Sequence, residues 1–430
     1  MKTFDEIIPA IKEVLAEKRA ELVALNGHRL IINRDLNGYV RILADESLDG
    51  DINIQSIVDA IKIKLEGRVP DVMPVLYDDS ETIEQSIRQN PHFEIEGYPQ
   101  VMVVDRTLFE SDANKRTDTV ATSVPRIVFY SIKGGVGRST ALSAAAWSFA
   151  EMGKRVLVLD MDLESPGITS SLLSTERMPM YGIADWLVED LTDNGNAVID
   201  NIMSLSDLSI NGEIWVAPAH GKNVGEYVEK LGRAWMPKVA SFEQRTPWYE
   251  RLNLLIADLE ERIHPDVLLI DSRAGIDEIS IACLTCLQAD TLLLFAMDSA
   301  QTWNGYQILF DYWRQHSMAS DIREHLQVVG ALIPETGRTE YLSNLWEHSW
   351  KLFAEKLYDE IPSGANDADA FNFDISDSSA PHAPWLINWN RGFNAQYNHS
   401  DIFKQEAIVS LIKSTFNDFV TSLKDVIQWK

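Results

Sequence analysis

One glycine-rich octapeptide constrains this chain more than any other stretch. It reads KGGVGRST over residues 133–140 and follows the apolar run RIVFYS, whose β-branched and aromatic residues indicate a buried strand. Three glycines allow the backbone to curl so that successive N–H groups point inward and form an anion-sized nest. The helix expected from Ser139 adds the dipole and unpaired N–H groups of its N-terminus. The pattern therefore predicts a phosphate-binding loop between a strand and a helix.

Acidic residues follow two further predicted strands. The run 155–159 ends in Asp160-Met161-Asp162, and the run 267–270 ends in Asp271. Because ligands of a parallel sheet bind at the carboxyl ends of its strands, we expect these carboxylates beside the loop. Ser139 offers a hydroxyl to Mg²⁺ and Arg138 a fixed positive charge to phosphate oxygens. The alternative, a glycine-rich turn without nucleotide, does not account for this combination.

The octapeptide resembles the deviant Walker A motif KGGxGK[ST] of the ParA/MinD family of ATPases, with Arg138 in place of the usual lysine. The strict pattern G-x-x-x-x-G-K-[ST] is not met, because Ile132 stands at its first position. The resemblance implies that Lys133 crosses a dimer interface to touch the partner subunit's ATP, and hence that ATP drives homodimerisation. The nucleotide-binding residues that it implies are Gly134, Gly135, Val136, Gly137, Arg138, Ser139, Thr140 and Gly275.

Two further segments resemble the same family. VLVLDMDLESPG is similar to its second acidic motif, which implies that Asp162 positions the attacking water. DSRAGIDE, from Asp271, is similar to its DSPAGIE segment, which implies that Asp271 holds Mg²⁺ through water and that the Gly275 N–H lies near the γ-phosphate. Arg273 replaces the proline, either as a phosphate or interface contact or as a plain surface charge. Together the resemblance implies catalytic roles for Lys133, Arg138 and Asp162, and metal ligands at Ser139, Asp162 and Asp271.

The family's base-reading Asn-Arg pair is missing, since the corresponding strand is followed by PETGR at 334–338. The prediction that the ligand is ATP therefore rests on the resemblance alone, and the choice between an adenine and a guanine nucleotide stays open. The segment 381–391, rich in Trp and Asn, is either a base-binding element or a loop at the edge of the core.

The predicted fold is α/β: a P-loop NTPase with a mostly parallel sheet flanked by helices, preceded by a small α+β domain. We expect the small domain over residues 1–110, a linker over 111–123, and the ATPase-like domain over 124–430 with insertions near 175–250 and 339–400. In the first part, helices are expected at 4–25, 52–65 and 81–89, and strands at 28–33, 39–44, 72–76 and 100–104.

Composition narrows the function classes. A net charge of -27 argues against autonomous DNA binding, which depends on neutralising phosphates. No apolar run reaches membrane-spanning length, and two cysteines give no disulfide framework, so a cytoplasmic protein is expected. Cys283 and Cys286 lie in an apolar helical segment and are interpreted as small buried residues in preference to cluster ligands. The amphipathic stretch 401–430 balances four lysines with four acidic residues, which favours packing on the domain over membrane binding.

These observations predict an ATP-binding and hydrolysing molecular switch, slow or partner-activated, which dimerises around nucleotide and regulates a partner protein. Residues 1–110 are the expected adaptor for that partner, and a multi-component bacterial system such as phage defence is a suitable setting. The alternative is a non-hydrolysing nucleotide-binding scaffold, because the forked guanidinium of Arg138 does not reproduce the geometry of a lysine. A tyrosine kinase is less favoured, because the C-terminus carries no tyrosine-rich tail.

Overall fold

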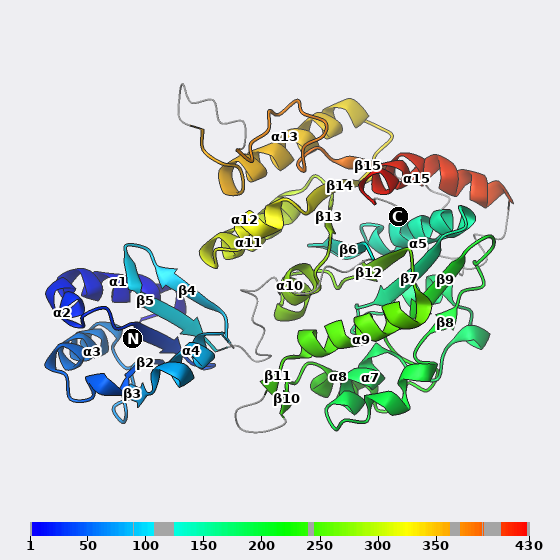
Figure 1. Cartoon of the computed structure of the whole chain (residues 1–430). Helices are drawn as coiled ribbons and strands as arrows, with labels where there is room; N and C mark the ends of the chain where they lie inside the picture. Colours follow the sequence, from blue (N-terminus) through cyan, green and yellow to red (C-terminus); the bar gives the residue numbers. More distant parts are fainter. Residues whose placement is uncertain are drawn as a thin grey trace. The chain divides into compact units, whose positions relative to one another are not determined.

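The structure is a computed structural model that describes residues 2–88, 90–106, 124–239, 245–361, 370–388, 390 and 406–427. The predicted linker, 111–123, lies outside the described residues, as do parts of both predicted insertions. The chain forms two compact units (Figure 1). The first unit comprises residues 1–114 and 315–317, and the second comprises residues 115–314 and 318–430.

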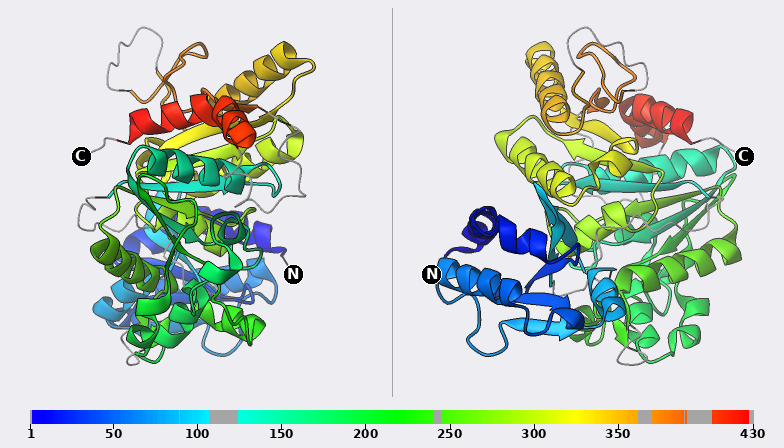
Figure 2. Two further views of the ribbon diagram at one scale, coloured as in Figure 1. Left: turned by 90° about the vertical axis from the view of Figure 1, so that its right-hand side faces the viewer. Right: turned by 60° about the vertical axis from the view of Figure 1, so that its left-hand side comes forward.

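The first unit, coloured blue to cyan in Figure 2, contains a mixed sheet. This sheet has five strands in the order β3-β2-β1-β5-β4. Strand β1 pairs antiparallel with β2 and parallel with β5. The strands are β1 (Leu30–Arg34), β2 (Val40–Asp45), β3 (Val75–Asp78), β4 (His92–Ile95) and β5 (Tyr98–Asp105). The helices are η1 (Phe4–Glu6), α1 (Ile7–Glu17), α2 (Arg19–Ala24), η2 (Glu46–Leu48), α3 (Ile52–Leu65) and α4 (Ser80–Arg88).

Alternate side chains of β1 enter two cores on opposite faces of this sheet. Leu30 and Ile32 join the cluster that contains α1 and α3, while Ile31 joins the cluster of α4. Helix α3 has the predicted bounds, but the helix expected over 4–25 is interrupted at Lys18, whose φ and ψ are -100° and 25°. The sequence also does not predict β4, a four-residue strand that pairs with β5.

The second unit is organised by an eight-stranded sheet with the order β15-β14-β13-β6-β12-β7-β9-β8. Every neighbouring pair is parallel except β8 and β9. The sheet strands are β6 (Arg126–Ser131), β7 (Arg155–Asp160), β8 (Ser204–Leu205), β9 (Glu213–Ala217), β12 (Val267–Asp271), β13 (Thr291–Ala296), β14 (Leu326–Ile333) and β15 (Trp385–Asn388). This arrangement confirms the predicted α/β class with a mostly parallel sheet.

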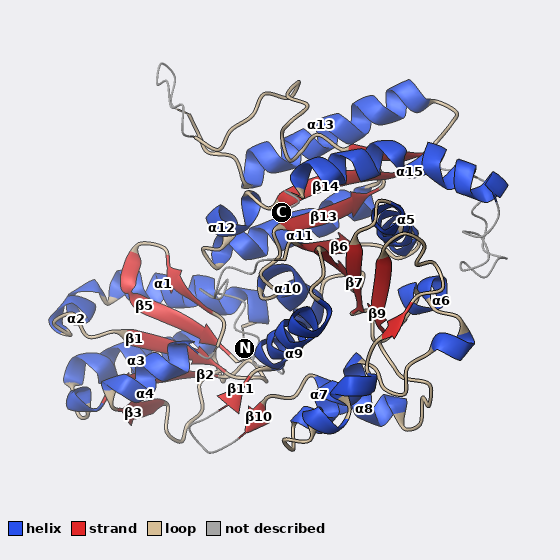
Figure 3. Cartoon of the chain, turned by 45° about the vertical axis from the view of Figure 1, so that its right-hand side comes forward, coloured by secondary structure: helices blue, strands red, loops and turns tan. Residues whose placement is uncertain are grey.

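Helices cover both faces of the sheet, and Figure 3 shows β7 and β9 between α10 on one side and α5 with α6 on the other. The helices described in this unit are α5 (Arg138–Glu151), α6 (Ile168–Leu172), η3 (Thr175–Arg177), α7 (Ile183–Asp190), η4 (Gly195–Ala197), η5 (Ile199–Asn201), α8 (Tyr227–Ala234), α9 (Trp248–Ile263), α10 (Glu278–Thr285), α11 (Ala300–Gln315), α12 (Ala319–Arg323), α13 (Arg338–Lys356) and α15 (Glu406–Val426). All six residues of β6 are buried. Phe129 packs with α5 and α15, and the ring of Tyr130 contacts the ring of Tyr306 in α11.

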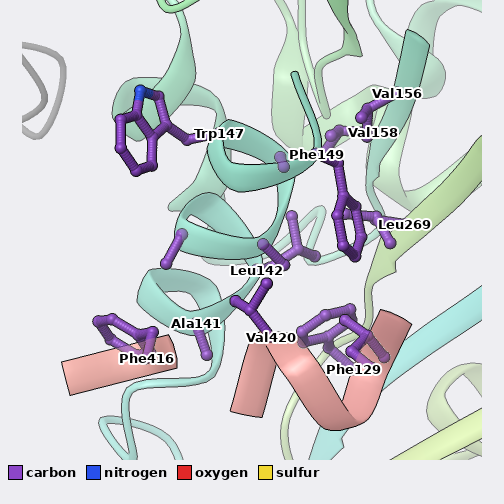
Figure 4. Close-up of a cluster of buried hydrophobic side chains, with 14 of the residues drawn as sticks. Phe129, Ala141, Leu142, Trp147, Phe149, Val156, Val158, Leu269, Phe416 and Val420 are labelled. Atoms are coloured by element: carbon purple, nitrogen blue, oxygen red, sulfur yellow. The ribbon is translucent and has the colours of Figure 1, made fainter. Parts of the chain in front are cut away.

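The C-terminal helix α15 is part of this core. Its buried residues include Phe416 and Val420, which lie against Ala141, Leu142 and Phe129 in Figure 4. The predicted packing of this amphipathic segment on its own domain is therefore what the structure shows. Within the described residues, no helix combines the length and the apolar character needed to cross a membrane.

The segment 175–250 holds two sheet strands, β8 and β9, where the sequence indicates one. It also forms α7, α8 and a small hairpin of β10 (Lys238–Val239) and β11 (Arg245–Thr246). Trp235 and Trp248 meet edge to face at 4.8 Å and both are buried, so these tryptophans serve internal packing.

Candidate functional site

The loop that joins β6 to α5 is shaped for an anion. Gly135 and Gly137 adopt left-handed backbone angles, with φ of 75° and 81°. Gly137 is the N-cap of α5, and no side chain among the described residues bonds the first N–H groups of this helix. A Cβ placed on Gly134 or Gly135 would meet no atom within 4 Å beyond the chain neighbours. The loop therefore presents backbone N–H groups and a helix N-terminus to open space.

Ile132, which breaks the strict phosphate-loop pattern, packs against α11. An ideal Cβ on Gly305 would lie 2.4 Å from the Cγ2 atom of Ile132, so the absence of a side chain at Gly305 makes room for it. The isoleucine side chain is thus accommodated by the neighbouring helix. Lys133 and the two glycines after it are exposed, whereas Val136 is buried and Thr140 half-buried.

Arg138 connects the loop to two strand-end carboxylates. Its Nε donates to Asp271 Oδ1 at 2.7 Å, and its Nη2 donates to Asp162 Oδ2 at 3.2 Å. The side chain is 8% exposed, and although burial lowers the pKa of Arg138, these two carboxylates raise it overall. Ser139 Oγ donates to Asp271 Oδ2 at 2.7 Å. The structure therefore brings together Arg138, Ser139, Asp162 and Asp271, which the sequence places at three separate points of the chain.

Asp160 lies beneath this cluster and is fully buried. Thr169 donates to its Oδ2 through the hydroxyl at 2.6 Å and through the N–H at 3.3 Å, while Oδ1 has no hydrogen-bond partner among the described residues. Burial, together with the Asp271 carboxylate, raises the pKa of Asp160 to about 7. Burial also raises the pKa of Asp162, although Arg138 opposes that shift.

Arg273 joins the same two strand-end loops a second time. It lies 2.6 Å from Glu164, in the loop after β7, and 2.8 Å from Asp277 at the start of α10. Arg273 therefore links the two loops and is not a plain surface charge, while its contact with a phosphate or an interface stays a prediction. The Gly275 N–H, assigned to the γ-phosphate by resemblance, donates to the Ser131 carbonyl at 3.0 Å in this structure.

Sequence reasoning did not single out Glu164 or Thr169. Glu164 is separated from Arg273 by 109 residues, so its role as an ion-pair partner follows from the neighbouring positions of β7 and β12 and from nothing local. Thr169 is an ordinary hydroxyl in the first turn of α6, and its importance appears once Asp160 is seen to be buried.

The resemblance implies Mg²⁺ with Ser139, Asp162 and Asp271 as ligands, and the geometry tests that expectation. Both oxygens of Asp271 and one of Asp162 accept from Arg138 or Ser139, and the other oxygen of Asp162 accepts from the Ser165 N–H at 3.2 Å. In the part of the chain that the structure describes, no group of three or more His, Cys, Asp or Glu residues is placed to hold a metal ion. As arranged here, the residues do not fit a resident magnesium ion.

Two candidate segments remain, and base binding by the second of them stays a prediction. Cys283 and Cys286 form no disulfide and are buried in and next to α10, in agreement with their interpretation as small core residues. In the stretch 381–391, expected either to bind a base or to edge the core, Trp385–Asn388 form β15, which pairs with β14 at the end of the sheet. His382 lies shortly before β15, is buried and is hydrogen-bonded to Tyr358.

A glycine nest at the junction of a central parallel strand and a helix, with aspartates at the ends of two neighbouring strands, defines the class of this unit: it is a P-loop nucleotide-binding domain. Residues 124–209 match the sequence model of the ParA family, described as NUBPL iron-transfer P-loop NTPase. The chain is 28% identical over 190 residues to a protein named septum site-determining protein MinD from Oltmannsiellopsis viridis, a match that covers 44% of this chain and 50% of that protein. The matched region thus spans about half the length of this curated relative.

Solved structures of similar proteins include the MinD cell division protein of Aquifex aeolicus, which is 18% identical, with 70% of this chain and 98% of that chain covered and a TM-score of 0.41. Another is pNOB8 ParA bound to nonspecific DNA, which is 17% identical, with 71% and 97% covered and a TM-score of 0.42. The sequence matches confirm the resemblance to the ParA/MinD family of P-loop ATPases that the motifs indicate, and the family model places it in residues 124–209 of the second unit.

Proposed function

We propose that this chain is an ATP-binding and hydrolysing switch that dimerises around nucleotide and regulates a partner protein. The observation that carries the proposal is the open loop before α5, where Gly135 and Gly137 have left-handed backbone angles and Gly137 starts a helix without a side-chain cap. Such a concave array of donors binds a polyphosphate without further side chains.

The residues around the loop would divide the remaining work. Lys133 is exposed on the loop, which supports a contact with a second subunit's nucleotide. Asp162 is half-buried beside the loop, and its carboxylate would orient the water that attacks the terminal phosphate once it leaves Arg138. Catalysis of this kind is mostly positioning and charge stabilisation, which suits slow or partner-activated turnover.

The charges elsewhere in the chain suggest how the switch acts on other molecules. Residues 1–110 carry 21 acidic and 12 basic residues, and we propose that this part binds a protein partner. With a net charge of -27, the chain is not expected to hold DNA on its own. A cytoplasmic location within a multi-component bacterial system, such as phage defence, completes the proposal.

Steady-state ATP hydrolysis and sedimentation velocity of the full chain test this function. Wild type should turn over ATP slowly and shift from monomer to dimer with ATP. Lys133→Ala should lose the dimer, because its cross-subunit contact is gone. Asp162→Ala should keep the dimer and lose turnover by about a hundredfold or more. Arg177→Ala, at an exposed ion pair with Asp207, is a matched control that should leave both readouts unchanged.

A non-hydrolysing scaffold is the second candidate, and the geometry of Arg138 favours it. The guanidinium engages Asp162, the carboxylate expected to orient water, and so holds it away from that task. Bound ATP without measurable turnover in wild type, with the dimer retained, would identify the scaffold. Absence of both binding and turnover would remove both candidates.

A further inference from the structure

The carboxylates that follow β7 and end β12 are paired with a positively charged side chain of the protein itself. Arg138 reaches Asp271 with Nε and Asp162 with Nη2, so one guanidinium spans both groups. The remaining oxygens accept from Ser139 Oγ and from the Ser165 N–H. All four carboxylate oxygens that are expected to serve a magnesium ion therefore already accept a hydrogen bond.

The residue type explains this arrangement. A lysine in this position carries a point charge at the end of a flexible stem, whereas the planar fork of arginine can bond two carboxylates at once. Mg²⁺ demands near-octahedral oxygen ligands and binds proteins through one or two carboxylates. To enter here, Mg²⁺ would have to displace the guanidinium of a side chain that is 8% exposed and leave that charge buried without its two partners.

The same guanidinium retains donors for a ligand. Of its five N–H groups, the two on Nη1 make one long contact, 3.5 Å to Ser131 Oγ. Arg138 is also the first residue of α5, so its backbone belongs to the helix N-terminus that faces the loop. A phosphate in the glycine nest would therefore meet a positive charge that is already held in place.

Arg273 makes an independent connection between the same two loops. It replaces the proline of the related motif and pairs with Glu164 after β7 and with Asp277 after β12. Both arginines that depart from the related motifs thus bridge the end of β7 to the end of β12, which is the connection that a metal ion makes between ligands of neighbouring strands.

We propose that Arg138 takes the place of the divalent cation, so that this chain binds a nucleoside triphosphate at the glycine loop without requiring magnesium. The inference rests on the proposed nucleotide binding at that loop. It makes Arg138 the residue that determines the metal requirement: the guanidinium neutralises Asp162 and Asp271 and, with the loop N–H groups and Lys133, balances the charge of the phosphates.

Isothermal titration of the full-length wild type with ATPγS, once in excess EDTA and once in excess magnesium chloride, tests the proposal. The dissociation constants should agree within about threefold. Binding in magnesium but not in EDTA would overturn the inference and leave the proposed nucleotide binding intact. Binding in neither condition would overturn the proposed function and the inference with it. The wild-type comparison decides without any variant.

Arg138→Lys assigns the effect to the residue. It keeps one positive charge but cannot span both carboxylates, so its affinity should become magnesium-dependent by about tenfold or more. Arg177→Lys, the same exchange at an exposed ion pair, should keep the wild-type metal independence. Metal-independent binding by a folded Arg138→Lys variant, with folding checked by circular dichroism, would overturn the assignment to Arg138.

Discussion

Replacing Phe419 by alanine should unfold the second unit far more readily, because this side chain anchors α15 to the sheet. Phe419 is fully buried, and its ring lies 6.2 Å from Phe129, 6.2 Å from Phe295 and 6.3 Å from Trp385. Transfer of a buried Phe side chain contributes about 2–3 kcal/mol. The lost aromatic contacts and the cavity bring the expected cost to about 4 kcal/mol, within the range found for Phe→Ala in protein cores.

Urea unfolding followed by tryptophan fluorescence measures this cost in the right part of the chain. All 12 tryptophans lie between Trp147 and Trp429, so the signal reports the second unit alone. At an m-value of about 3 kcal/mol/M, the midpoint should fall by about 1.3 M. Asp418→Ala, the exposed neighbour on the same helix, should change stability by no more than about 0.5 kcal/mol. Equal effects of the two substitutions would refute the packing of α15 on the sheet.

Three further outcomes follow from buried groups. Burial lowers the pKa of His382, so its imidazole binds a proton more readily in the unfolded chain than in the native protein. The free energy of unfolding should therefore fall as the pH drops below 6.5. An NMR titration of the His382 ring in the native protein should show a midpoint below 6.5. Cys283 and Cys286 are buried, and burial raises the pKa of the Cys283 thiol, so Ellman's reagent should label neither in the native protein and both in urea. Arg251→Ala removes a fully buried guanidinium that lies 2.7 Å from Asp190, and should cost about 3–5 kcal/mol in the same urea assay; a loss under about 1 kcal/mol would contradict this.

The central strands could be predicted from the sequence because each is a continuous apolar run with turn residues or charges on both sides. The strands β6 and β12 are buried along their whole length, which leaves no competing amphipathic pattern. Short elements could not be predicted in this way. Strand β8 has two residues and depends on pairing with β9, and the break at Lys18 between α1 and α2 has no proline or glycine to announce it.

The candidate site also has a part that could be predicted from the sequence and a part that could not. Because ligands bind at the carboxyl ends of parallel strands, the order of strands and loops in the sequence is enough to predict Asp162 and Asp271 beside the glycine loop. The hydrogen-bond partner of each carboxylate cannot be predicted in the same way. Arg138 and Asp271, for example, are 133 residues apart in the sequence. Partnerships of this length are set by tertiary packing, so the bridging role of Arg138 and the Arg273–Glu164 pair could not be predicted from local sequence.

Amide hydrogen exchange of the full chain, with and without saturating ATP, tests the central claim most directly because it locates the ligand. The account predicts that ATP slows exchange by about tenfold or more in the peptide that contains residues 133–140, since those N–H groups would bond phosphate oxygens. Unchanged exchange in that peptide at saturating ATP, whether or not protection appears elsewhere, would contradict it.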